Sequence, residues 1–201
     1  MSPRVVDKAA KRREILKSAM TVFAQRGIYD FKMIDIARAA QVGKGTLYEY
    51  FSSKEDLIAG CFDLFLRDYN GYLAGRMKSA GDPVEKLKIM VKASFEFFVK
   101  NGDTLEIVFD FWAASIRYKD GQPLMSGAND GYRKVIGEVA GLIREGIDQG
   151  VFRPVDARLA ARMLLASLDG LLLQSVMGLT KINSRSLPQK FSQTFLEGIL
   201  K

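Results

Sequence analysis

Apolar residues recur at helical spacing along most of the chain, and no stretch alternates between apolar and polar residues for long enough to predict a strand. The first apolar stripe covers 16–23 and closes at Gly27, a residue type common just past the end of a helix. Turn residues, glycines and prolines divide the rest of the pattern into further helices, expected over 32–40, 45–51, 54–78, 83–100, 104–118, 130–149, 156–177 and from 188 onward. The sequence therefore predicts an all-α fold with nine helices.

The same pattern predicts two domains. The three helices at the front are too short to bury a core alone, so we expect them to pack on one another and on the start of the long helix over 54–78. That long helix would then link two lobes. We expect a small domain over 1–55 and a larger helical domain over 56–201.

Positive charge is concentrated at the front of the chain. The formal net charge is +7, from 30 Lys and Arg against 23 Asp and Glu. Residues 1–58 hold 11 basic and 7 acidic side chains, whereas 59–201 hold 19 and 16. Because nucleic-acid affinity comes largely from basic groups that neutralise phosphates, this concentration favours a nucleic acid as partner.

Cysteine use and hydropathy point to the cytoplasm. Cys61 is the single cysteine, so no disulfide can form within the chain, which is typical of a reducing compartment. Its place in a helical apolar series favours a buried structural thiol over a redox sensor. No apolar run follows the basic N-terminus, so no signal peptide is expected. The apolar stretch 159–177 is interrupted by Arg162, Asp169 and Gln174, which predicts a buried helix and no membrane partner.

The short helices over 32–40 and 45–51, joined by a tight turn, have the dimensions of a helix-turn-helix. In this motif the second helix lies in the major groove and its N-terminal residues contact the bases. Gly43, Lys44 and Gly45 leave the start of that helix slim, so the backbone can approach double-stranded DNA closely. The candidate DNA-binding residues are Lys32, Lys44, Gly45, Thr46, Tyr48, Tyr50 and Lys54.

Alternative interpretations stay open for some of these residues. Tyr48 and Tyr50 could cover the core of the small domain, and Lys44 could be a solvated lysine. Leu47 and Phe51 are expected to face inward and hold the second helix in place.

The front of the chain resembles the DNA-binding domain of the tetracycline-repressor (TetR) family. The resemblance rests on 13–23, Gly27, 35–37, 45–51 and 53–57, which read REILKSAMTVF, G, DIA, GTLYEYF and SKEDL. It implies an all-helical homodimer with three DNA-binding helices in each subunit and a larger ligand-binding domain. Most members are repressors that a small molecule releases from a palindromic operator.

Two departures from the family pattern affect local geometry. Phe31 stands where the family often has Thr or Ser, so Asp30 is expected to cap the helix over 32–40 instead. The usual Ala-Gly-Val-Ser turn reads Ala-Gln-Val-Gly over 40–43. Gln41 therefore has to adopt a turn geometry that glycine adopts more easily. Gly43 has no hydroxyl with which to cap the next helix.

The larger domain is rich in aromatic side chains that could line a cavity for a small ligand, with ordinary core packing as the alternative. Asp110 and Asp169 interrupt apolar helices, and a buried carboxylate without a partner is unfavourable. Asp110 could therefore orient a cationic or hydroxylated ligand, or pair with Arg117 or Arg162. The candidate ligand-binding residues are Met90, Phe95, Phe98, Phe109, Asp110, Trp112, Ile116, Leu165 and Asp169. The apolar surroundings favour a lipophilic or aromatic effector.

The last two helices carry many leucines and phenylalanines and some small residues, which predicts a homodimer through a four-helix seam. Two rival functions are weighed against the repressor. An enzyme would have to work without histidine and without a clustered metal-binding pattern, so no enzyme activity, metal or cofactor is expected. A DNA-binding activator or architectural protein without an effector would show steep salt dependence and little sequence preference.

Overall fold

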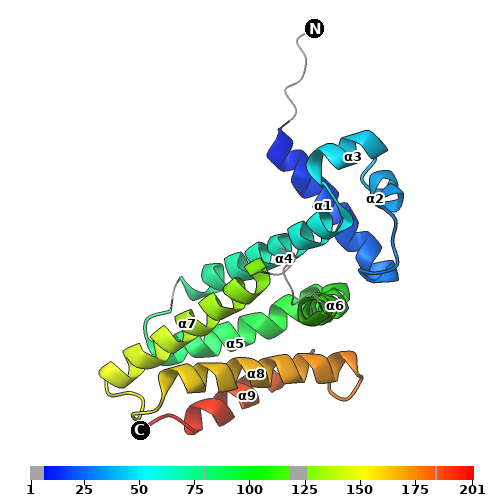
Figure 1. Cartoon of the computed structure of the whole chain (residues 1–201). Coiled ribbons are helices and arrows are strands. Elements are labelled where there is room, and N and C mark those ends of the chain that lie inside the picture. Colours follow the sequence, from blue (N-terminus) through cyan, green and yellow to red (C-terminus); the bar gives the residue numbers. More distant parts are fainter. Residues whose placement is uncertain (1–6, 79, 118–125, 184) are drawn as a thin grey trace. The chain divides into compact units, whose positions relative to one another are not determined.

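The structure is a computed structural model that describes residues 7–78, 80–117, 126–183 and 185–201; for 103, 115–117 and 126–129 it describes the backbone alone. Within these ranges the chain forms nine helices and no strand, which confirms the predicted all-α fold (Figure 1). The helices are α1 (Lys8–Arg26), α2 (Met33–Ala39), α3 (Lys44–Tyr50), α4 (Lys54–Met77), α5 (Pro83–Lys100), α6 (Gly102–Arg117), α7 (Ser126–Asp148), α8 (Ala157–Val176) and α9 (Leu187–Glu197).

The first of two compact units comprises Met1–Arg67 and Glu106–Ala128. It therefore contains α1, α2, α3, the first half of α4 and most of α6. Its core is made of side chains that leave less than 2% of their surface exposed: Ile15, Leu16, Phe23, Ile28, Ile36, Leu47, Phe51, Leu57 and Phe111. The Phe62 ring contacts the Phe111 ring edge-on, with 5.0 Å between the ring centres. The placement of α6 in this unit was not predicted from the sequence.

Caps fix where the helices of the first unit begin. The Asp7 carboxylate accepts hydrogen bonds from the backbone N–H groups of Ala9 and Ala10, and α1 follows. The expectation that Asp30 caps α2 is wrong. Lys32 occupies the cap position, and the Asp35 carboxylate accepts its backbone N–H at 2.9 Å.

The turn between α2 and α3 has the geometry that the sequence required. Gln41 has a φ of 53°, the left-handed region that glycine adopts most easily. Before α4, the Ser53 hydroxyl accepts the backbone N–H of Asp56 at 3.1 Å, and the Asp56 carboxylate accepts the N–H of Ser52 at 2.8 Å. The predicted serine cap is therefore confirmed.

Cys61 on α4 is fully buried, and its Sγ lies 3.7 Å from the carbonyl oxygen of Leu16. Burial raises the pKa of this thiol well above its ordinary value, so the reactive thiolate does not form at neutral pH. The predicted structural role of Cys61 is thus confirmed.

The second unit comprises Asp68–Leu105 and Asn129–Lys201, and so contains the second half of α4 together with α5, α7, α8 and α9. Leu87, Phe95 and Phe152 are among its most deeply buried side chains. The Phe152 ring packs directly on Gly146 of α7, where a Cβ would overlap it. Beside this contact, the Arg153 N–H donates to the carbonyl of Ile199 at 2.9 Å and ties the end of the chain to the segment that follows α7.

One described helix, α8, is long and apolar enough by length and composition to cross a membrane. One of its faces is buried in the core of the second unit through Ala161, Leu164 and Leu168, whereas Arg158 and Arg162 are exposed. The predicted buried helix is therefore found in part: one face lies in the core, whereas Leu159, Met163 and Leu173 on another face are exposed.

Candidate DNA interface and ligand site

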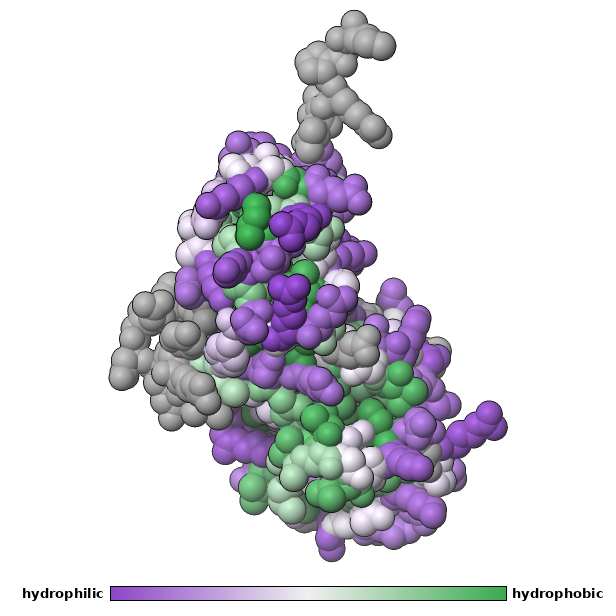
Figure 2. All heavy atoms as spheres, turned by 90° about the vertical axis from the view of Figure 1, so that its right-hand side faces the viewer, coloured by the Kyte–Doolittle hydropathy of each residue, from purple (hydrophilic) through white to green (hydrophobic). Residues whose placement is uncertain are grey.

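The α2–α3 surface presents most of the predicted DNA-binding residues. Lys32, Lys44, Gly45 and Tyr48 are exposed, and Tyr48 leaves 46% of its surface open. Thr46 and Tyr50 are half-buried. In Figure 2 the face of the first unit that carries α2 and α3 is covered mostly by hydrophilic residues. This exposed, hydrophilic surface is accessible to a polyanion.

The opposite side of α3 explains why this surface is held in place. Leu47 and Phe51 are both 0% exposed, as predicted, and both sit in the core of the first unit. No atom lies within 4 Å of a Cβ built at Gly45, so the first turn of α3 is open to close approach. The seven-residue helix α3 thus has one side that is fixed in the core and another side whose first turn leaves room for a partner.

Two basic side chains near this surface contact the protein itself. The Lys54 ammonium donates to the carbonyl of Tyr29 at 2.9 Å and lies 4.2 Å from the centre of the Phe31 ring. The Arg12 guanidinium lies 4.8 Å from the centre of the Phe51 ring. These contacts stabilise the small unit, and the DNA contact of Lys54 stays a prediction. Arg4, part of the basic N-terminal segment, lies outside the described residues.

The predicted ligand-binding residues on α6 belong to the first unit. Phe109 and Trp112 contact each other edge-on, with 5.3 Å between ring centres. The Asp110 carboxylate accepts the backbone N–H of Ile28 at 3.4 Å, just after the end of α1. This contact gives Asp110 a partner within the first unit. The backbone of Ile116 lies in α6, and its side chain is outside the described ones.

The other predicted ligand-binding residues lie in the second unit. Met90, Phe95, Phe98 and Leu165 are all buried, and Asp169 is half-buried. The structure therefore divides the predicted set between the two units, four on α6 and five in the second unit.

Asp169 belongs to a polar cluster that the sequence did not reveal, formed with Tyr69, Ser94 and Tyr132. The Tyr132 hydroxyl donates a hydrogen bond to the Asp169 carboxylate. The Tyr69 and Ser94 hydroxyls are hydrogen-bonded at 2.8 Å, and the Ser94 hydroxyl also donates to the carbonyl of Met90 at 2.9 Å. The four side chains come from α4, α5, α7 and α8. Helical periodicity gives no sign that these side chains converge.

Burial perturbs the acid–base behaviour of this cluster. Removal from water raises the pKa of Asp169 from 3.8 to about 6, although the hydrogen bond from Tyr132 acts in the opposite direction. Burial also raises the pKa of Tyr69 to about 12, with a further contribution from the nearby Asp169 charge. The pKa of Tyr132 rises for the same two reasons and because its hydroxyl is hydrogen-bonded to Asp169. At neutral pH Asp169 is therefore charged and both tyrosines are neutral.

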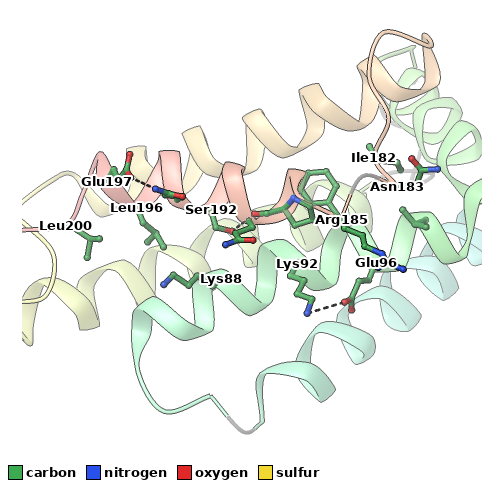
Figure 3. A pocket seen from close by; sticks show the side chains of 15 residues that line it. Lys88, Lys92, Glu96, Ile182, Asn183, Arg185, Ser192, Leu196, Glu197 and Leu200 are labelled. Atoms are coloured by element: carbon green, nitrogen blue, oxygen red, sulfur yellow. Dashed lines mark hydrogen bonds and ion pairs between the residues drawn. The ribbon is translucent and has the colours of Figure 1, made fainter.

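A groove of about 840 Å³ runs between α5 and α9 in the second unit (Figure 3). Lys88, Lys92 and Glu96 project from α5, and Ser192 and Leu196 project from α9. Lys92 forms an ion pair with Glu96 at 3.8 Å across one turn of α5. Among the predicted ligand-binding residues, Phe95 alone lines this groove.

Comparisons with known proteins agree with this geometry. Residues 15–61 match the model described as bacterial regulatory proteins, tetR family, and residues 83–200 match the C-terminal domain of BetI-type transcriptional repressors. The chain belongs to the tetR family of bacterial regulatory proteins. This confirms the resemblance drawn from the sequence, and with it the predicted function of a DNA-binding repressor that a small ligand releases.

Individual relatives of this tetR-family repressor are similar over most of their length. The chain is 31% identical over 170 residues to the HTH-type transcriptional repressor KstR2 of Mycolicibacterium smegmatis, over 82% of this chain and 79% of that protein. The regulator FadR of Bacillus subtilis, solved in complex with stearoyl-CoA, matches with a TM-score of 0.80 and 22% identity, over 93% of this chain and 98% of that one. A regulator from Saccharomonospora viridis, solved in complex with choline, matches with a TM-score of 0.79 and 24% identity, over 96% and 99%. The FadR structure and the Saccharomonospora viridis structure therefore have the same fold as this chain.

Proposed function

We propose that this tetR-family repressor binds a palindromic operator as a homodimer, with Lys44, Gly45, Thr46 and Tyr48 of α3 at the major groove. The observation that carries the proposal is the two-sided nature of α3. Its buried side is fixed by Leu47, while its opposite side is exposed and polar. A helix held in this way can present the same side chains to base edges in every encounter.

Lys32, Tyr50 and Lys54 are proposed to contact phosphates on either side of α3. Lys32 is exposed at the start of α2, so its ammonium reaches solvent. Lys54 would act through charge while it keeps its hydrogen bond to Tyr29. Phosphate contacts fix the position of a protein on DNA and carry no sequence information, whereas contacts from α3 would supply it.

The proposed dimer seam is the exposed apolar stripe of α8. Leu159, Met163 and Leu173 of α8, together with Met177 just after it, repeat at helical spacing, and each exposes at least 43% of its surface. Hydrophobic residues also gather on the surface of the second unit in Figure 2. Water contact along such a stripe is unfavourable, and burial against the same stripe of a second copy removes it. Two-fold symmetry of the protein would match the symmetry of the operator.

The effector is proposed to bind in the second unit among Met90, Phe98, Leu165 and Asp169, and to be a small molecule with a lipophilic or aromatic part. The convergence of four helices on the Asp169 cluster supports this choice. Helix α4 begins in the first unit and ends in the second, so a change in its packing can affect both. A coupling of roughly 1–3 kcal/mol would change operator affinity about 5–150-fold. Such a repressor would act in the cytoplasm.

The test begins with selection of operator DNA from random fragments by the purified full-length chain. Lys44→Ala is then compared with Lys100→Ala, which removes an exposed lysine at the end of α5. We expect Lys44→Ala to weaken operator binding by about 1–3 kcal/mol and to relax the sequence preference at one base pair, because Lys44 is proposed to contact a base edge. Lys100→Ala should match the wild type. Equal binding by all three proteins, or steep salt dependence with no selected sequence, would overturn the proposal in favour of non-specific DNA binding.

A further inference from the structure

The Asp169 carboxylate carries a negative charge for which the described part of the second unit offers no basic partner. Its hydrogen bond comes from the neutral hydroxyl of Tyr132, and no described Lys or Arg forms an ion pair with it. Arg162, seven residues earlier on α8, is exposed. An ionised carboxylate withdrawn from water is unfavourable unless a positive charge or several N–H donors compensate it.

Two phenylalanine rings pack on one member of the same cluster. The Tyr69 ring packs on Phe97 and Phe98, with ring centres at 5.1 and 5.6 Å. The charge of Asp169 acts on the hydroxyls of both Tyr69 and Tyr132, so these two side chains lie near the carboxylate. Proteins bind organic cations, including quaternary ammonium groups, with carboxylates and aromatic side chains, and both kinds of side chain lie together in this cluster.

We propose that the effector carries a positively charged group that pairs with Asp169 and packs against the rings of Tyr69 and Tyr132. This inference rests on the proposed function, and it adds the sign of the effector's charge, which apolar composition does not indicate. The cation supplies the charge that the protein lacks at this point. An anionic effector would meet Asp169 with the same sign of charge and bind less well for that reason.

The charge dependence can be measured with ligands that differ in charge alone. Choline and its uncharged carbon isostere, dimethylbutanol, have nearly the same shape. Each is titrated into the full-length wild-type protein by calorimetry, together with benzyltrimethylammonium as a larger cation and butyrate as a small anion. We expect the two ammonium compounds to bind at least about tenfold more tightly than dimethylbutanol and butyrate.

The variant Asp169→Asn keeps the size of the side chain and an acceptor for Tyr132, and it removes the charge. Asp148→Asn, at the exposed end of α7, is the matched control. Asp169→Asn should lose the preference for ammonium compounds, with a fall in their affinity on the order of tenfold or more, and leave dimethylbutanol binding unchanged. Asp148→Asn should behave like the wild type. If a variant fails to fold, the comparison of charged and uncharged ligands on the wild-type protein still tests the proposal.

The outcomes separate this inference from the proposed function. Equal binding of choline and dimethylbutanol, no binding of any ammonium compound, or unchanged ammonium affinity in Asp169→Asn overturns the cationic effector. If butyrate or another anion releases the protein from its operator, the ligand-released repressor stands and the assignment of charge is wrong. If the wild type fails to bind any selected DNA, the proposed function itself fails, whatever the ligand titrations show.

Discussion

Replacement of Asp169 by Asn should stabilise the free protein, and the gain should grow with pH. In the folded chain the pKa of Asp169 is raised to about 6, because burial disfavours its charged form. The unfolded chain keeps a value near 3.8. Between these two values the folded state binds more protons than the unfolded state, so the contribution of this group to stability falls as the pH rises through that window.

The size of the effect follows from the difference of about two pKa units. Each unit corresponds to about 1.4 kcal/mol, so the ionised carboxylate costs the folded state about 3 kcal/mol above pH 6. This is an upper value, since the side chain is only half-buried. Asn carries no charge at any pH. It should therefore match the wild type near pH 4 and exceed it by up to about 3 kcal/mol near pH 7.5.

The assay is urea unfolding of both proteins at a series of pH values, with the free energy of unfolding extrapolated to water. Tyr69 and Tyr132, which also belong to the cluster, stay neutral throughout this range because their pKa values are raised. All other groups are common to the two proteins and cancel in the difference. A difference that stays constant between pH 4 and pH 7.5 would show that Asp169 is not desolvated in solution and would refute the reasoning.

Four further substitutions test the packing of the two units and the proposed dimer seam. Gly146→Ala should destabilise the second unit by about 1–3 kcal/mol in thermal unfolding, because the new Cβ overlaps the Phe152 ring. Gly141→Ala in the same helix is the control. Its Cβ meets no atom within 4 Å, so it should stabilise the unit by about 0.5–1 kcal/mol. Gln41→Gly should raise stability by up to about 1 kcal/mol, since a φ of 53° strains a residue with a Cβ; a lower melting temperature would contradict this. Met163→Glu should shift the protein from dimer to monomer in analytical ultracentrifugation, and an intact dimer would place the seam elsewhere.

Local features of the DNA-binding helices could be predicted from the sequence because they depend on near neighbours. The spacing of Leu47 and Phe51 was enough to place both in the core. The strained turn at Gln41 followed from the absence of a glycine at that position. The cap of α2 was predicted wrongly because two acidic residues, Asp30 and Asp35, precede or open the helix, and only the backbone geometry selects Asp35.

The Asp169 cluster could not be predicted from the sequence, because it depends on which helices meet. Periodicity does not indicate that the Tyr69 hydroxyl bonds to Ser94 or that the Tyr132 hydroxyl bonds to Asp169. The aromatic residues of α6 were predicted to line one site together with those of α5. Most of α6 belongs to the first unit and α5 to the second, and the shared site stays a prediction. Amphipathic helices of similar composition can exchange neighbours without a change in their sequence pattern, so this assignment requires the tertiary structure.

Asp110 and Asp169 give the same signal in the sequence, an acidic residue that interrupts an apolar helix, and the structure gives them different partners. Asp110 accepts a backbone N–H from Ile28, 82 residues away in the chain, where α1 has just ended at Gly27. An N–H donor stabilises a carboxylate, so the protein itself stabilises the Asp110 carboxylate in part. Asp169 receives a hydrogen bond from a neutral tyrosine hydroxyl, and its charge remains without a described cation. Its raised pKa is consistent with that difference. Of these two carboxylates, Asp169 is therefore the one that a positively charged ligand would stabilise most.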